Sequence, residues 1–335
     1  MADHAGEHAG EEEHAGEVYN VNLQVGGLFI VITASVLGIV SSYVLARQGG
    51  KEGCDKSSAL QAVIVFVKGL SCGVVISVAL VHLISEAYEG YAVAGWTFPA
   101  WPMVFVMVGI YFMAAMDLIG QRFYSSGEVG GGSDHGHGHG HAGALVLDGA
   151  QSCEPATTKE GVLVTNLRVT ACVVEIGILL HSIIIGLDLG LQNEDSWAII
   201  LVAVALHQFL EGLMLGQVLG ELRNNDEQAS RRKVWTMIIL FTLTTAVGIA
   251  IGIIVRTSTA DYADPVAMEL TLAILNSLAG GLLLYLGLAS LLVPWFVSSP
   301  TMRVASKTFV AIGFIGLAFG LAGMTAISLA EGVAH

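Results

Sequence analysis

Charged residues are scarce in this chain of 335 residues: Asp, Glu, Lys and Arg make up 13% of it, whereas apolar residues make up 54%. Soluble domains carry roughly 25% charged residues, so the composition excludes an ordinary soluble protein and indicates an integral membrane protein. Ten-residue segments of alternating apolar and polar residues, which are typical of membrane-spanning strands, are also lacking. The sequence therefore argues against a β-barrel and predicts an all-α fold.

Several motifs are lacking as well. The net charge is −14 and no basic stripe is present, which argues against nucleic-acid binding. Without a phosphate-binding GxxxxGK[ST] motif, we expect no ATP hydrolysis by this chain. The acidic first 17 residues contain no cationic segment followed by an apolar one. We therefore expect no ordinary cleavable signal peptide, and the first spanning helix then serves as the targeting signal. None of the four cysteines is in a CxxC motif, which predicts reduced thiols.

Long apolar segments are what the chain does have. A stretch of about 20 apolar residues is long enough to cross a bilayer as a helix. Eight such stretches are present, at residues 23–46, 59–84, 101–119, 167–191, 197–219, 234–255, 268–293 and 308–329. The long polar segment after the third stretch and the short connection after the fourth divide the helices into three, two and three. Such a 3+2+3 arrangement suits an inverted repeat that flanks a central pair.

The basic residues predict the orientation. Twelve of the 14 Lys and Arg residues lie in the connections after the first, third, fifth and seventh helices. Basic connections stay in the cytoplasm, so both termini are predicted to be extracellular. The chain then consists of an acidic, His-containing extracellular tail (1–20), transmembrane helices one to three (21–120), a cytoplasmic His/Gly-rich loop (121–166) and transmembrane helices four to eight (167–335).

Two histidines lie within the fourth and fifth apolar stretches. His181 begins the run HSIIIGLDLG, and His207 begins HQFLEGLMLG. Polar groups in hydrocarbon are costly and by default mark an ion path. His207 and Glu211 are four residues apart and share a helical face, with Gln208 on its flank. Imidazole and carboxylate together suit Zn²⁺, Fe²⁺ and Mn²⁺, so we predict a divalent-metal site in the middle of the membrane.

Hydrogen bonding between helices is the alternative for these polar groups. A single intramembrane Ser or His often makes such a contact, worth roughly 0.6 kcal/mol on average, and Ser182 alone fits that alternative well. Two histidines and a glutamate on adjacent helices fit a metal site better. Small residues are expected to bring the polar faces of the two helices within ligand distance. They are Gly186 and Gly190 on the fourth helix, and Gly212, Gly216 and Gly220 on the fifth.

Other polar residues are candidates for the path of a cation. His82 and Glu86, four residues apart at the predicted outer end of the second helix, suit either the entrance or a plain interfacial position. Asp117, near the inner end of the third helix, suits either a pathway or an interface. Glu175 lies toward the cytoplasmic half of the fourth helix, where a released cation would pass. Asp188 lies on nearly the same face as His181.

Four histidines alternate with glycine in the long loop: His135, His137, His139 and His141. In an extended chain, residues two apart lie on one side, so the four imidazoles can jointly hold a metal ion. The affinity should be modest and pH-dependent, because a flexible segment loses entropy on ordering. We interpret the run as a cytoplasmic metal buffer or sensor, with a dispensable linker as the alternative.

The paired motifs resemble the signatures of the ZIP (Zrt-, Irt-like protein) metal transporters. HSIIIGLDLG followed by HQFLEGLMLG is similar to the HSxxxGxxxG and HQxxEGxxxG patterns of the plant, fungal and protist branch. The resemblance implies uptake of zinc or ferrous iron into the cytosol by alternating access. It also implies that His181, His207, Gln208 and Glu211 hold the metal, with Ser182 nearby. Ile185 stands where some members carry a carboxylate that helps to bridge a second metal, so we expect one strong site.

A transporter of this kind is not an enzyme and needs no resident cofactor. Its expected partners are the lipid bilayer and the transported Zn²⁺ or Fe²⁺, with Mn²⁺ and Cd²⁺ as further candidates. We expect it in the plasma membrane, and a homodimer is one alternative for its oligomeric state. The rival interpretation is an intramembrane zinc-dependent hydrolase. We favour transport because the sequence has no HExxH motif and because His82, at a predicted helix end, is no obvious third zinc histidine.

Overall fold

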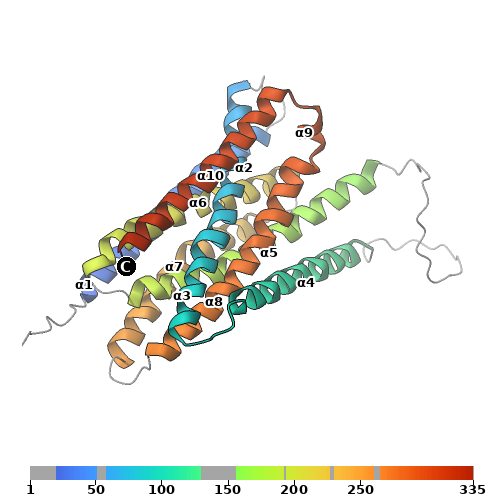
Figure 1. Cartoon of the computed structure of the whole chain (residues 1–335). Helices are drawn as coiled ribbons and strands as arrows, with labels where there is room; N and C mark the ends of the chain where they lie inside the picture. The colour runs from blue at the N-terminus through green and yellow to red at the C-terminus, as the bar shows by residue number, and fades with distance from the viewer. Residues whose placement is uncertain are drawn as a thin grey trace, which may run out of the picture.

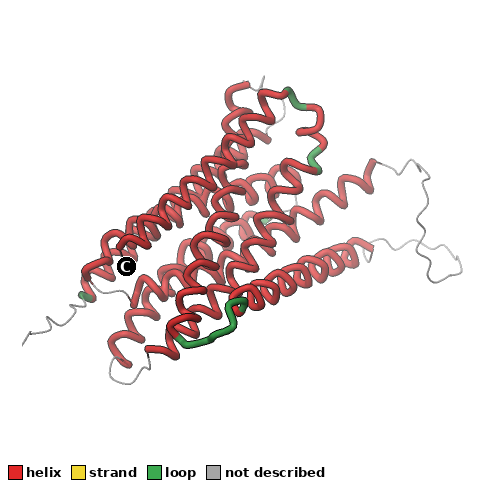
Figure 2. Tube along the Cα trace, viewed as in Figure 1, coloured by secondary structure: helices red, strands yellow, loops and turns green. Residues whose placement is uncertain are grey.

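The computed structural model describes residues 20–50, 58–129, 156–191, 194–226, 230–259 and 265–334, and this part of the chain is almost entirely helical (Figure 1 and Figure 2). Helices are expected because every backbone N–H and C=O in a bilayer must be satisfied within the protein. The elements in chain order are α1 (Val21–Gly50), α2 (Ser58–Ser77), η1 (Val78–Leu83), α3 (Ile84–Val93), α4 (Trp101–Val129), α5 (Ala156–Leu191), α6 (Glu194–Asn225), α7 (Arg231–Thr259), α8 (Pro265–Tyr285), η2 (Leu286–Val297), α9 (Pro300–Val304) and α10 (Lys307–Ala334).

Within the described residues, eight helical segments are long and apolar enough to cross a membrane, which confirms the eight predicted spans. Six of them belong to α1, α4, α5, α6, α7 and α10. The second span is the continuous segment α2–η1–α3, and the seventh is α8–η2–α9. Both η1 and η2 are π-helix, a wider helical turn that is frequent at functional sites. The protein is therefore an all-α, multi-pass membrane protein.

The helices extend beyond the predicted apolar stretches, as three examples show. The second span continues through α3 to Val93, past its predicted end at residue 84. In the predicted loop 121–166, α4 continues to Val129 and α5 already begins at Ala156. Hydropathy follows the side chains, whereas a helix is held by backbone hydrogen bonds that continue past polar residues such as Glu86. Residues 1–19 and 130–155, which include most of the two predicted polar appendages, lie outside the described residues.

The spans are divided between two bundles. The first bundle consists of α1, α5, α6 and α7, in which α1 lies against α6 and α5 against α7, and α1–α7 and α5–α6 contacts close the group. The second bundle consists of α2–η1–α3, α4, α8–η2 and α10. There α10 lies along α2, and α8 lies between α3 and α4 (Figure 1). Contacts between the bundles, such as α2 with α6 and α4 with α5, are less extensive.

These contacts follow the predicted 3+2+3 arrangement. The first span lies against the fifth and the sixth against the fourth, while the second lies against the eighth and the seventh against the third. An inverted repeat exchanges the first span with the sixth, the second with the seventh, the third with the eighth, and the fourth with the fifth. Under this exchange the contact of the first and fifth spans becomes that of the sixth and fourth. The contact of the second and eighth spans likewise becomes that of the seventh and third. Because successive spans cross in opposite directions, the first and sixth are antiparallel, as an inverted repeat requires. The repeat also matches η1 in the second span to η2 in the seventh.

Candidate metal centre

Glycines fix the two helices that carry the central residues. A Cβ atom on Gly190 of α5 would lie 2.5 Å from the carbonyl oxygen of Ile249 in α7, and one on Gly216 of α6 would lie 2.5 Å from that of Ile39 in α1. Small residues allow helix backbones to approach this closely. The expectation that these glycines join α5 to α6 is wrong, because they face away from that seam, toward α7 and α1. The seam between α5 and α6 contains polar side chains.

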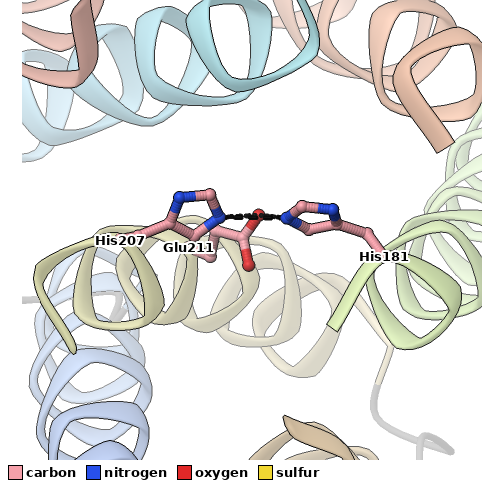
Figure 3. A group of neighbouring side chains, drawn as sticks. All are labelled: His181, His207 and Glu211. Atoms are coloured by element: carbon pink, nitrogen blue, oxygen red, sulfur yellow. Dashed lines mark hydrogen bonds and ion pairs between the residues drawn. The ribbon is translucent and has the colours of Figure 1, made fainter. Parts of the chain in front are cut away.

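Three of these side chains converge between α5 and α6 (Figure 3). His181 Nε2 lies 3.0 Å from His207 Nε2. Glu211 Oε1 lies 3.4 Å from the first of these nitrogens and 3.3 Å from the second. Two bonds of about 2.0–2.1 Å from a tetrahedral zinc ion place their ligand atoms about 3.3–3.4 Å apart. The three atoms therefore form a triangle close in size to one face of such a coordination sphere.

The triangle is shielded from solvent. His181 and Glu211 are 0% exposed and His207 is 3% exposed. A carboxylate in hydrocarbon is costly unless it is paired or coordinated. The imidazoles beside it stabilise the carboxylate when one of them is protonated, and they coordinate a cation when both are neutral. The arrangement can thus hold a proton or a divalent cation at the point where the two helices meet.

Ser182 and Gln208 follow the two histidines in sequence and are also buried, each 1% exposed. Neither Ser182 Oγ nor Gln208 Nε2 has a hydrogen-bond partner among the residues that the structure describes. Buried polar groups with a purely structural role are nearly always hydrogen-bonded. The alternative role of Ser182, a hydrogen bond between helices, is therefore not supported by any such bond among the described residues.

His82 lies closer to the centre than its sequence position suggested. It belongs to η1, and its ring centroid is 5.6 Å from that of His207, in an edge-to-face arrangement. The prediction that His82 is at a helix end is wrong, because the second span continues past it as α3. His82 Nδ1 is 2.8 Å from Glu86 Oε1, and Asn276 Nδ2 of α8 donates to Glu86 Oε2 at 3.3 Å. A chain of polar groups leads from His207 to the 42% exposed side chain of Glu86.

The other pathway candidates are not part of the group of ligand atoms. Asp117 accepts hydrogen bonds from Tyr285 Oη at 2.8 Å and from Gln121 Nε2 at 3.1 Å, and the first of these joins α4 to α8. Glu175 is 5% exposed, and neither of its carboxylate oxygens has a hydrogen-bond partner within the described ranges. Asp188 is partly exposed near the C-terminal end of α5. The loop histidines His135, His137, His139 and His141 lie outside the described residues, so their role stays a prediction.

Sequence reasoning passed over three polar residues of the first bundle. Gln217 on α6 and Thr245 on α7 are both 0% exposed, and the Gln217 amide and Thr245 Oγ1 have no hydrogen-bond partner in the described part of the chain. Glu221, near the end of α6, forms an ion pair with Lys68 of α2. The signal that points to Glu221 is its spacing of 14 residues from His207, which returns to nearly the same helical face. No comparable signal marks Thr245.

The inverted arrangement of eight spans and the buried seam of imidazole and carboxylate groups define a class, the membrane transporters of divalent cations. Comparison of the sequence with known proteins identifies the family within this class. Residues 21–328 match the family described as ZIP Zinc transporter, and the chain belongs to that family. The resemblance seen in the two motifs is thereby confirmed, and the function of the protein is the transport of divalent metal.

Individual relatives agree with this assignment. Zinc transporter 6, chloroplastic, of Arabidopsis thaliana is 27% identical over 328 residues, which cover 92% of each chain. Fe(2+) transport protein 1 of Arabidopsis thaliana is 27% identical over 314 residues, which cover 91% of this chain and 85% of that protein. Zinc-regulated transporter 1 of Candida albicans is 25% identical over 284 residues, covering 81% and 53%. These relatives give no support to the rival interpretation as a hydrolase.

Proposed function

We propose that the protein takes up Zn²⁺ or Fe²⁺ into the cytosol and that His181, His207 and Glu211 bind the ion midway across the membrane. The observation that carries this proposal is the convergence of two imidazole nitrogens and a carboxylate oxygen from neighbouring helices, 3.0–3.4 Å apart. Ser182 and Gln208 supply further oxygen atoms next to the histidines. The named activities of the relatives, which include both zinc and Fe(2+) transport, support the choice of ions.

Burial explains why a divalent ion suits this position. An ionised carboxylate at the centre of a bilayer costs about 2.5–3.5 kcal/mol on insertion scales. A doubly charged ion between Glu211 and the two imidazoles offsets this cost. Zn²⁺ and Fe²⁺ both accept a mixed nitrogen and oxygen ligand set, and Mn²⁺ and Cd²⁺ are further candidates for the same set.

The route into the site runs past His82. Glu86 is the more exposed member of the His82–Glu86 pair, so it meets an arriving cation first. From there the edge-to-face contact of His82 with His207 leads to the central triangle. We infer that Asp117 acts at the α4–α8 interface, while Glu175 and Asp188 remain candidates for the route on α5. Access alternates as the two bundles move relative to each other.

Electrical potential and proton competition complete the cycle. A doubly charged ion that crosses an inside-negative potential of 100 mV gains about 4.6 kcal/mol, twice the value for a single charge. Uptake therefore proceeds without ATP. Protonation of His181 or His207 weakens metal binding and assists release. We place the protein in the plasma membrane with extracellular termini, the orientation that its basic connections favour. A homodimer is compatible with this proposal, and neither a resident cofactor nor an enzymatic step enters it.

Flux measurements test this function directly. The purified protein is reconstituted into sealed vesicles that contain a metal-sensitive dye, and a potassium diffusion potential makes the interior negative. We expect Zn²⁺ and Fe²⁺ influx that grows with the potential, and competition with Mn²⁺ and Cd²⁺ ranks the ions. Vesicles with Glu211→Ala protein are the control for leakage. Flux no greater than in this control would contradict transport, and cleavage of lipid or peptide without flux would revive the hydrolase.

A further inference from the structure

A cluster of three side chains joins the two bundles near the end of α6. Lys68 of α2 forms an ion pair with Glu221 Oε1 of α6. Trp295 of η2 donates its indole N–H to Glu221 Oε2 at 2.8 Å, and Lys68 Nζ lies 5.3 Å from the centroid of the Trp295 ring. The carboxylate belongs to the first bundle, whereas both of its partners belong to the second. Any separation of the bundles at this point must therefore release the Glu221 carboxylate.

Gln217 adds an unsatisfied polar group to the same face. It precedes Glu221 by four residues on α6, so the two side chains are neighbours on one side of the helix. Gln217 is 0% exposed, and neither its amide oxygen nor its amide nitrogen has a hydrogen-bond partner among the described residues. A buried amide without a hydrogen-bond partner destabilises the folded protein. Structural stability therefore does not explain its presence, whereas a ligand would satisfy it.

Glu221 of the cluster lies on the same helix, α6, as Glu211 of the metal triangle. Glu221 follows Glu211 by ten residues, which is about 15 Å along a helix. The Glu221 side chain is 21% exposed, whereas that of Glu211 is 1% exposed, so solvent reaches only the outer of the two carboxylates. The connection that follows α6 is the most basic in the chain, which predicts that this end of α6 faces the cytoplasm. Glu221 thus lies between the triangle and the side of metal release.

We propose that Glu221 and Gln217 form a second station for the transported divalent cation, and that Lys68 fills this station as a tethered cation when no metal is there. This inference rests on the proposed transport function and extends it to the release route. A carboxylate oxygen and an amide oxygen are ligands that divalent cations accept. The Lys68 ammonium keeps the carboxylate neutralised while the bundles are in contact. An arriving ion carries twice that charge, displaces the ammonium, and breaks the link between the bundles on the release side.

Metal binding to the station can be measured with the transport site removed. The probe is Mn²⁺, which favours oxygen ligands, and the free ion is counted by electron paramagnetic resonance. The parent is the full chain with His181→Ala, His207→Ala and Glu211→Ala. Adding Lys68→Met should raise the affinity of the parent for Mn²⁺ about tenfold or more, because a like charge within a few ångströms is gone. Adding Glu221→Gln to Lys68→Met should abolish this gain, and Gln217→Leu should reduce it.

Matched variants distinguish a metal station from a general effect of surface charge or of misfolding. Lys307→Met removes an exposed positive charge at the start of α10 and should leave the Mn²⁺ affinity unchanged. Glu221→Asp keeps the carboxylate and should retain the gain, which guards against misfolding as the cause of a loss. If Lys68→Met and Lys307→Met give the same affinity, or if Glu221→Gln keeps the gain, the station does not exist.

Transport by the otherwise unchanged protein separates the station from a merely structural ion pair. Glu221→Gln should lower Zn²⁺ uptake, and the exchanged pair Lys68→Glu with Glu221→Lys should not restore it, because the carboxylate is then on the wrong helix. Full rescue by the exchange would reduce the cluster to a structural contact. Failure of the proposed function has a different signature: His207→Ala and Glu211→Ala would transport at the original rate, whatever the Mn²⁺ titration shows.

Discussion

The two bundles use the same means of packing but differ in the state of their buried polar groups. Each is held by glycines that bring helix backbones together: Gly248 of α7 against α5 in the first, and Gly73 of α2 against α10 in the second. Most buried hydroxyls of the second bundle form hydrogen bonds with groups of that same bundle. Ser71 donates to Val67 O, and Ser277 donates to Ala273 O, both within their own helices.

The first bundle buries polar groups that its own atoms do not satisfy. Ten described residues have a buried side-chain nitrogen or oxygen atom without a hydrogen bond, and seven of them lie on α5, α6 or α7: Glu175, His181, Ser182, Gln208, Glu211, Gln217 and Thr245. Such atoms are expensive in an apolar interior. Their concentration in one bundle supports the proposal that the first bundle binds the ion, while the second bundle packs against it. Substitutions in the two bundles should therefore differ in kind.

The largest difference is expected at the metal triangle. His207→Ala or Glu211→Ala should lower Zn²⁺ uptake more than about 100-fold, since each removes a proposed ligand and even an outer partner of a metal site is worth 10- to 100-fold. Ser277→Ala, a buried polar change in the second bundle, should stay within about twofold of the original uptake, because its hydrogen bond is local. Uptake of radioactive zinc by metal-starved cells, normalised to surface protein, measures both. Uptake at the original rate in both triangle variants would refute the ligand assignment.

Because glycines pack the helices in both bundles, replacing such a glycine with a large residue should destabilise the protein to a similar extent in either bundle. Gly186→Leu on α5 and Gly69→Leu on α2 each place a side chain against the backbone of a neighbouring helix. Each should destabilise the protein by about 2–3 kcal/mol, as overpacking of a tight interface does. Thermal unfolding in detergent, monitored by size-exclusion chromatography, measures this loss of stability.

The control for this pair is a glycine with open space around it. A Cβ atom on Gly323 of α10 meets nothing within 4 Å, so Gly323→Ala should leave the melting temperature unchanged or slightly raised. If Gly69→Leu were tolerated while Gly186→Leu was not, the close approach of α2 and α10 would not be a packing requirement, and the likeness of the bundles would fail.

His82 is the place where the second bundle contacts the site of the first. Its ring lies against that of His207, but its nitrogen is not among the converging ligand atoms. His82→Ala should therefore raise the KM for Zn²⁺ about tenfold, the lower limit for an outer group, and change the maximal rate much less. Uptake measured over a range of zinc concentrations separates the two parameters. A loss as complete as that of His207→Ala would make His82 a ligand and would erase the distinction between the bundles.

Hydropathy and helical spacing predicted the spans and the central residues, because both depend on local sequence. Eight apolar stretches gave eight helices, and the spacing of His207 and Glu211 placed them on one face. The partner of each glycine was predicted wrongly, since the face that a glycine occupies does not tell which neighbouring helix covers it. His82 was misplaced because Glu86 and the residues after it lower the hydropathy of a helix that continues. The Lys68–Glu221 pair joins residues 153 positions apart, and nothing local encodes such a contact.

The smallest effect on transport is expected from the His/Gly-rich segment, which lies outside the described residues. Deleting residues 134–141 should change the rate of zinc uptake by less than about twofold, because a polar, Gly-rich segment of this composition does not build a packed core on which the bundles depend. Regulation should change more. We expect the surface amount of the variant to respond less to excess zinc than that of the full chain, if the alternating histidines sense the cytoplasmic metal. Surface labelling over several hours of zinc exposure measures that response. Loss of all transport on deletion would instead make the segment part of the conduction machinery, and the division of labour would then extend beyond the two bundles.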